Sequence, residues 1–392
     1  MRHTCSHTVA TTHLNCINKP FVYILAQSDI IDTMGISTPI LRTIVAGILA
    51  AGAATYVASI AVTHRKHKKT PPRSNPPTVS YPDYALSEHT FLSPSTCRTI
   101  SWAEYGSPVS KNIVIYQHGL PGSRILPVGP NIKGKDIRVL AMDRPGIGFT
   151  SLPISGKTIM ETAISDVYEL LDHLEISEKV ILCGFSAGGP HVLGIMFTHP
   201  EKIRATYCLG PATYLDDKIN WDDLAPGSKS TNWWTQNFPR YTTFDMILRA
   251  DKIVDCSNII DNMKNFSSEG DAIFLSENPV EAKGWQNVNY EAYRQGITGY
   301  LQSCMEIFGR VSTNPWPVVG DIVHQKGIEG QKVVIIHRES DHLTPISGSR
   351  DLVRRLKAAG ADAEFIFPEG PEGGHFQALN YGMDYILAHE CK

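Results

Sequence analysis

Six short apolar segments, each followed by a glycine or a polar loop, constrain the fold of this 392-residue chain more than any other feature. Each segment holds five or six residues, a length that suits strands buried on both faces of a parallel sheet. Stretches with helical periodicity lie between them, so the order of elements predicts an α/β fold with right-handed crossovers. The segments are 112–117, 137–142, 179–183, 204–209, 332–337 and 363–368.

The segment 212–317 interrupts this alternation because it contains no strong strand pattern. It holds five of the six tryptophans, in a helical and irregular context with polar turns. We predict that it is a helical lid inserted between two halves of the core, 83–211 and 318–392. Its aromatic side chains fit two uses equally well, lining an apolar pocket or packing the lid onto the core.

The overall composition excludes several classes of protein. Hydrophobic residues make up 42% and charged residues 19% of the chain, which is enough apolar material for a large core and excludes global disorder. The 36 basic and 39 acidic residues give a net charge of −3, so we expect no nucleic-acid partner. Eight cysteines without a CxxC motif indicate free thiols in a reducing compartment, and no metal site.

An uncharged stretch of 19 residues at 44–62 predicts a single transmembrane helix. The basic run HRKHKK follows it at once, which places the C-terminal side in the cytosol by the positive-inside rule. Residues 63–82 then form a basic and proline-rich linker, and 1–43 an N-terminal tail in which Met34 is an alternative start. A cleaved signal peptide and a buried soluble helix are the competing interpretations of this stretch.

The motif Gly184-Phe185-Ser186-Ala187-Gly188 follows the segment 179–183 and precedes a helical stretch. A G-x-S-x-G sequence between a strand and a helix is typical of a sharp turn that exposes a nucleophilic serine above the sheet. The N-terminus of the following helix favours negative charge at that point. We therefore predict that Ser186 is a nucleophile.

A serine nucleophile needs a base and a third group that orients the base. Asp341 lies in the loop after the segment 332–337, and Glu339 is its nearby rival. His375 follows two glycines after the last predicted strand, and His342 competes with it but is adjacent to Asp341. The chain order Ser, Asp, His predicts the triad Ser186, Asp341 and His375.

Acyl transfer also requires N–H donors for the oxyanion. One candidate is the backbone N–H of Ala187, directly after the nucleophile. The other is that of Leu120, in the loop that follows the segment 112–117. His118, at the start of this loop, is expected to brace it and not to act as a base.

These motifs together make the chain resemble the α/β-hydrolase superfamily, specifically its lid-bearing branch. The resemblance implies an eight-stranded, mostly parallel sheet, a helical cap, and a triad of nucleophile Ser186, base His375 and acid Asp341 that needs no cofactor. The motifs that carry it are HGLPGSR (118–124), DRPGIGFT (143–150), GFSAGG (184–189), SDHLTP (340–345) and GGH (373–375).

Differences from the motifs of related enzymes reduce the number of reactions that this chain is expected to catalyse. The HGxPG loop resembles that of epoxide hydrolases and haloalkane dehalogenases, but those enzymes carry an aspartate where this chain has Ser186. Proline iminopeptidases often carry two glycines after the histidine of this loop, whereas Leu120 intervenes in this chain. The HGGG loop of lipases is missing. We expect a membrane-anchored serine hydrolase of a small or lipid-like apolar acyl ester. Acyl transfer with the same triad and a non-catalytic binding protein of this fold are the alternatives.

Overall fold

The computed structural model describes residues 87–127, 132–213, 220–255, 266–309, 327–368 and 374–391. These residues all belong to one compact unit, Asn75–Lys392. The predicted tail, the predicted transmembrane helix at 44–62 and the linker at 63–82 lie outside the described residues. Within the described part of the chain, no helix combines the length and the apolar character that crossing a bilayer requires.

The described residues form an eight-stranded sheet with the order β1-β2-β4-β3-β5-β6-β7-β8. Strands β3 to β8 pair in parallel, whereas β1 and β2 pair antiparallel to their neighbours. This confirms the predicted α/β hydrolase fold with a mostly parallel sheet. The strands are β1 (Ser87–Leu92), β2 (Thr99–Gly106), β3 (Ile113–Gln117), β4 (Arg138–Met142), β5 (Val180–Phe185), β6 (Ile203–Leu209), β7 (Lys332–Ile336) and β8 (Asp362–Ile366).

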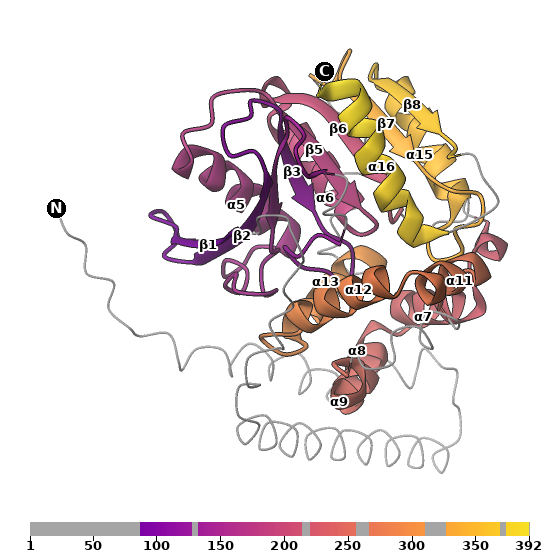
Figure 1. The fold of residues 1–392 in the computed structure, drawn as a ribbon. Coiled ribbons are helices and arrows are strands. Elements are labelled where there is room, and N and C mark those ends of the chain that lie inside the picture. Colours follow the sequence, from indigo (N-terminus) through magenta and orange to yellow (C-terminus); the bar gives the residue numbers. More distant parts are fainter. Residues whose placement is uncertain are drawn as a thin grey trace, which may run out of the picture. The chain divides into compact units, whose positions relative to one another are not determined.

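Helices cover both faces of the sheet (Figure 1). Because side chains alternate along a strand, Ile113 and Ile115 join one hydrophobic cluster while Val114 and Tyr116 join the other. Three helices contribute to the first cluster and α16 to the second. These helices are α5 (Ile159–His173), α6 (Gly188–Thr198), α15 (Ile346–Ala358) and α16 (His375–Glu390).

A helical insertion lies between β6 and β7, and Figure 1 shows its helices gathered at one end of the sheet. We use the name helical insertion for residues 220–255 and 266–309. Its elements are the 3₁₀ turn η2 (Trp221–Asp223) and the helices α7 (Pro226–Asn237), α8 (Pro239–Leu248), α9 (Ala250–Ile253), α11 (Glu269–Glu277), α12 (Pro279–Ala292) and α13 (Thr298–Phe308). A further 3₁₀ turn, η1 (Pro200–Lys202), precedes β6.

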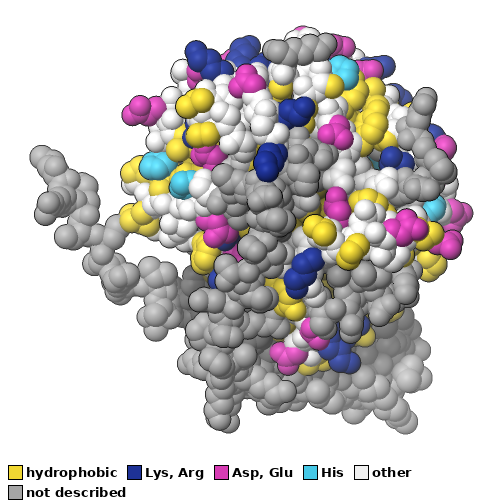
Figure 2. Space-filling model, viewed as in Figure 1, with side chains coloured by type: hydrophobic (Ala, Val, Ile, Leu, Met, Phe, Trp, Pro, Cys, Tyr) yellow, Lys and Arg dark blue, Asp and Glu magenta, His cyan; other side chains and the backbone are white. Residues whose placement is uncertain are grey.

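Acidic and basic side chains are interspersed over the face that Figure 2 shows. No broad basic area is visible among the described residues of this face, in agreement with the net charge of −3.

The helical insertion meets the core through a close approach of two backbones. A Cβ atom at Gly299, in α13, would lie 2.3 Å from the carbonyl oxygen of Gly146. Gly146 itself has a φ of +80°, which disfavours any other residue there. Only glycine at both positions allows this contact.

We expect Gly299→Ala to lower the free energy of unfolding by about 1–3 kcal/mol, because the added methyl group overlaps a carbonyl oxygen that cannot move away freely. Urea denaturation measures this change. Gly284→Ala is the matched control, since a Cβ there lies 3.3 Å from Cβ and 3.8 Å from Cα of Pro127 and meets no carbonyl oxygen. Equal destabilisation by the two substitutions would contradict the close approach.

Candidate active site

Ser186 lies at the turn between β5 and α6, with a left-handed backbone φ of +52°. Its N–H donates to the carbonyl of Leu209 at 2.9 Å, and its own carbonyl accepts from Gly189 and Ala212, both at 2.9 Å. These hydrogen bonds hold a conformation that a residue with a side chain rarely adopts. Such stored strain is concentrated at functional sites.

The glycines that flank Ser186 are required by packing. A Cβ at Gly188 would lie 2.0 Å from the carbonyl oxygen of Gln117 in the neighbouring strand β3. One at Gly184 would lie 2.5 Å from the carbonyl oxygen of Gly188. The G-x-S-x-G motif is therefore a steric requirement of this turn, as the sequence predicts.

Asp341 and His375 form a buried pair, with 2.7 Å between Asp341 Oδ2 and His375 Nδ1. Asp341 Oδ1 also accepts the N–H groups of Leu343 at 2.9 Å and Thr344 at 3.1 Å. Both side chains are at most 1% exposed. The structure thus brings together Asp341, from the loop after β7, and His375, the first residue of α16.

Asp341 and His375 each stabilise the charged form of the other. Burial alone would raise the pKa of Asp341, but the imidazoles of His375 and His337 and their hydrogen bonds hold it well below its ordinary value. Burial alone would lower the pKa of His375, but Asp341 and Asp271 raise it above its ordinary value. An ionised Asp341 therefore stabilises a protonated His375.

The second nitrogen of the ring, His375 Nε2, is buried and has no hydrogen-bond partner. The structure describes no hydrogen bond between this atom and Ser186 Oγ, although both residues line the same cavity. Such bonds are often long without substrate and tighten in the complex. Nε2 is the one nitrogen of this ring that is free to take a proton.

The rival residues lie elsewhere. The carboxylate of Glu339 is 82% exposed, 3.5 Å from Arg350. His342 is exposed, and its Nδ1 hydrogen-bonds to the carbonyl of Asp223 at 2.9 Å. Neither side chain lines the cavity that Ser186 and His375 share.

His118 braces the loop after β3. Its Nδ1–H donates to the carbonyl of Gly119 at 2.8 Å, and its Nε2 accepts the N–H of Arg144 at 3.2 Å. Burial and the nearby Arg144 charge lower the pKa of His118 well below its ordinary value. Both ring nitrogens are occupied, so His118 is not available as a base.

The two predicted oxyanion donors lie near each other. Leu120 packs against the hydrophobic cluster that contains Ala187, and Leu120 and Ser186 line the same cavity. Among the described residues, neither the N–H of Leu120 nor that of Ala187 donates a hydrogen bond. Both donors are therefore available to a bound oxygen.

The sequence reasoning missed Asp271, a fully buried carboxylate of α11. Asp271 accepts the backbone N–H groups of Gly374 at 3.1 Å, His375 at 3.0 Å and Phe376 at 3.0 Å. It therefore caps the N-terminus of α16, the helix that begins with His375. The pattern Ser268-x-x-Asp271 signals the start of a helix, but it gives no sign of a contact 103 residues away.

A second histidine was also missed. His337 Nε2 lies 3.1 Å from Asp341 Oδ2, and its Nδ1 is 2.7 Å from Ser349 Oγ. In the tautomer that donates from Nε2, His337 adds one more donor to Asp341. Its position directly after β7, four residues before Asp341, is the sequence signal that could have indicated this role.

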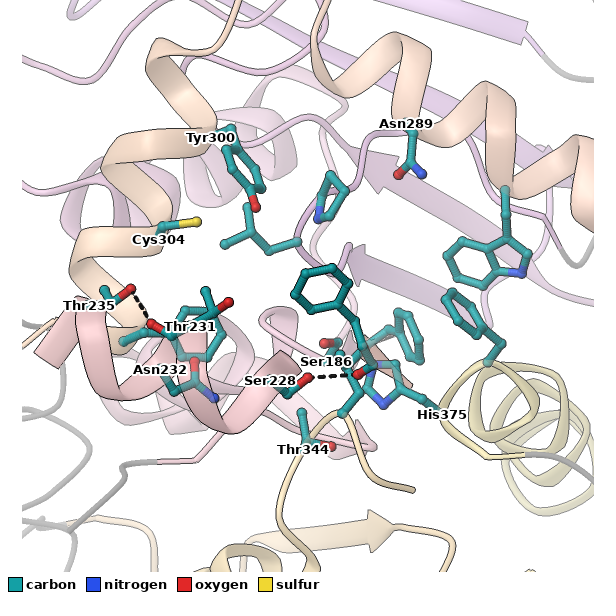
Figure 3. A pocket seen from close by; sticks show the side chains of 18 of the residues that line it. Ser186, Ser228, Thr231, Asn232, Thr235, Asn289, Tyr300, Cys304, Thr344 and His375 are labelled. Carbon is teal, nitrogen blue, oxygen red and sulfur yellow. Dashed lines mark hydrogen bonds between the residues drawn. The ribbon is translucent and has the colours of Figure 1, made fainter. Parts of the chain in front are cut away.

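A cavity of about 240 Å³ opens above Ser186 between the core and the helical insertion (Figure 3). This volume is somewhat below the ~300–1,000 Å³ typical of small-molecule sites. Most of its described lining is aromatic or aliphatic. The lining includes Leu120, Phe185, Trp285, Tyr300, Phe308 and Phe376 together with Ser186 and His375.

Comparison with known proteins identifies the fold and distant relatives. A family model described as alpha/beta hydrolase fold matches residues 112–377. A putative 2-succinyl-6-hydroxy-2,4-cyclohexadiene-1-carboxylate synthase of Bacillus subtilis (strain 168) is 32% identical over 99 residues, which cover 25% of this chain and 36% of that protein. A 2-hydroxymuconate semialdehyde hydrolase of Pseudomonas sp. (strain CF600) is 33% identical over 78 residues, or 20% and 27% of the two chains. The matched segments thus span about a third of the first relative and about a quarter of the second.

Solved structures agree with the fold. The structure of a putative lipase from Acinetobacter baumannii AYE superposes with a TM-score of 0.52 and covers 78% of this chain and 89% of its own. Its sequence identity is 13%, so this likeness concerns the fold alone.

We expect Asp271→Ala to lower the free energy of unfolding by about 2–5 kcal/mol, because each buried N–H left without an acceptor costs about 1–3 kcal/mol. Chemical denaturation measures this loss. Glu269→Ala, an exposed acidic residue in the first turn of the same helix, is the matched control and should change stability by less than about 0.5 kcal/mol. A similarly small effect of Asp271→Ala would show that the cap contributes little.

Proposed function

This chain belongs to the alpha/beta hydrolase fold family, and on that premise we propose that it is a serine hydrolase that cleaves a small or lipid-like acyl ester through an acyl-enzyme. The observation that carries the proposal is the buried Asp341–His375 pair, 2.7 Å apart, whose free Nε2 lines the same cavity as the strained Ser186. The nucleophile, base and acid of acyl transfer are recognised by these roles.

In the proposed reaction, Ser186 Oγ bonds to the acyl carbon while His375 Nε2 takes the hydroxyl proton. The N–H groups of Leu120 and Ala187 stabilise the negative oxygen of the tetrahedral intermediate. His375 then gives its proton to the leaving alcohol as the ester bond breaks. Water repeats the sequence on the acyl-enzyme and releases the acid. Asp341 stays ionised throughout and stabilises the imidazolium.

We expect Ser186→Ala to abolish labelling by a fluorophosphonate probe and to lower kcat by a factor of about 10³ or more. The probe reacts only with an activated serine. Ser228→Ala is the matched control, since Ser228 lines the same cavity but its hydroxyl donates to the carbonyl of Phe266 at 2.7 Å. Persistent labelling of the folded Ser186→Ala protein would refute the proposed nucleophile.

The activity should depend on pH through His375. Because only the neutral imidazole accepts a proton, kcat/KM should fall as the pH decreases through the pKa of His375, which lies above the ordinary value of about 6.5. Asp271→Asn removes a charge that raises this pKa and should move the midpoint to lower pH. The pH profiles of a neutral ester measure both effects. Glu269→Gln is the control and should leave the midpoint of the pH profile unchanged. An unchanged midpoint in Asp271→Asn would contradict the electrostatic effect of Asp271 on His375.

We further propose that residues 44–62 anchor the chain in a membrane, with the catalytic domain on the cytosolic side. The uncharged stretch and the basic run at 64–69 support this. A chain that begins at Tyr81 should be soluble and keep its activity toward small esters, measured after fractionation beside the full chain. Insoluble or inactive protein would indicate that the stretch packs into the domain instead.

A further inference from the structure

Helix α7 is turned with its polar side inward. Its buried residues include Ser228, Asn232 and Thr235, whereas Trp233 is 46% exposed and Trp234 is 42% exposed. A helix that covers a core ordinarily buries its apolar side. The inward placement of the polar side chains therefore needs a reason other than packing.

Two buried amides on different helices face the cavity without partners. Asn232 of α7 is 7% exposed and Asn289 of α12 is 9% exposed, and both line the cavity. Within the described residues, neither side-chain amide makes a hydrogen bond. Figure 3 shows the two amides reaching into the cavity from their separate helices.

Two hydroxyls of α7 near Asn232 already have hydrogen-bond partners. Ser228 Oγ donates to the carbonyl of Phe266 at 2.7 Å, and Thr235 Oγ1 donates to the carbonyl of Thr231 at 2.8 Å. The two amides that face the cavity are therefore available to form hydrogen bonds with a bound ligand.

Apart from the titratable His375, the described lining of the cavity contains no charged side chain. Among the described residues that line it, there is no Asp, Glu, Lys or Arg. Burying an unpaired charged group of a ligand there would be strongly unfavourable. A side-chain amide, in contrast, both donates and accepts hydrogen bonds, so it suits a neutral carbonyl or hydroxyl group.

We propose that Asn232 and Asn289 form a recognition site for neutral oxygen groups of the substrate. The substrate is then an uncharged acyl ester that carries at least one carbonyl or hydroxyl oxygen besides the ester that is cleaved. This inference rests on the proposed hydrolase function and names its substrate class.

Three esters of similar size test it, namely p-nitrophenyl 4-oxopentanoate, p-nitrophenyl pentanoate and the anionic p-nitrophenyl hydrogen glutarate. After correction for their rates of alkaline hydrolysis, the wild-type kcat/KM for the oxo ester should exceed that for the pentanoate about tenfold, the effect of one net hydrogen bond. The anionic ester should be the poorest substrate. A ratio near one for the two neutral esters, or a preference for the anion, would overturn the proposal.

Substitutions locate the effect. Asn232→Leu or Asn289→Leu should bring the ratio of the two neutral esters toward one, while Asn237→Leu, at an exposed position of α7, should leave the wild-type ratio unchanged. A ratio that survives both cavity substitutions in folded protein would refute the roles of the amides. If a variant does not fold, the wild-type ratio alone still decides the proposal.

A binding measurement separates this proposal from the hydrolase function. Calorimetry on Ser186→Ala protein should show the ethyl ester of 4-oxopentanoic acid binding about tenfold more tightly than ethyl pentanoate. If the Ser186→Ala protein shows this preference but the wild-type protein cleaves no ester, the hydrolase function is contradicted and the recognition site is supported. Equal affinities would contradict the recognition site whatever the activity.

Discussion

The buried carboxylate of Asp341 is the interaction on which the arrangement of the site depends. A charge that is almost fully buried is tolerated only when hydrogen bonds satisfy it. The carboxylate of Asp341 accepts hydrogen bonds from two backbone N–H groups and from the hydroxyl of Thr344 at 3.0 Å. It also contacts the rings of His375 and His337. The space between β6 and this carboxylate is so small that a Cβ at Gly210 would lie 3.1 Å from Oδ2. The acid therefore fixes the ends of β6 and β7 and the start of α16 relative to one another.

A second carboxylate ties the helical insertion to the same histidine. Asp341 contacts the ring of His375, whereas Asp271 accepts the backbone N–H of that residue and of its neighbours. A Cβ at Gly374 would lie 2.4 Å from the Asp271 carboxylate, so a glycine is needed where the two segments meet. The helical insertion thus forms part of the frame that orients His375, in addition to covering the cavity.

The sequence predicts those features that local patterns determine. Apolar runs such as that of β3 and the turn around Ser186 follow from short-range rules. The assignment of Asp341 and His375 rests on the chain order Ser, acid, His of the family that the chain resembles. Neither β1 nor β2 is among the six segments that the sequence predicts, and β1 is almost entirely exposed and has no apolar run. The role of Asp271 and the inward amides could not be predicted, since they depend on how whole helices rotate and pack.

The contacts of the helical insertion also determine how it can move. Glu291 of α12 accepts from Arg124 at 2.6 Å in a buried network with Asp143, and breaking such a pair costs about 3–5 kcal/mol. The cap by Asp271 adds to this cost. Helices α7 and α8, in contrast, have few apolar buried residues and expose Trp234 and Tyr241. Moving them exposes little additional apolar surface. Separation of α11 and α12 from the core therefore breaks more buried polar contacts than displacement of α7 and α8 does.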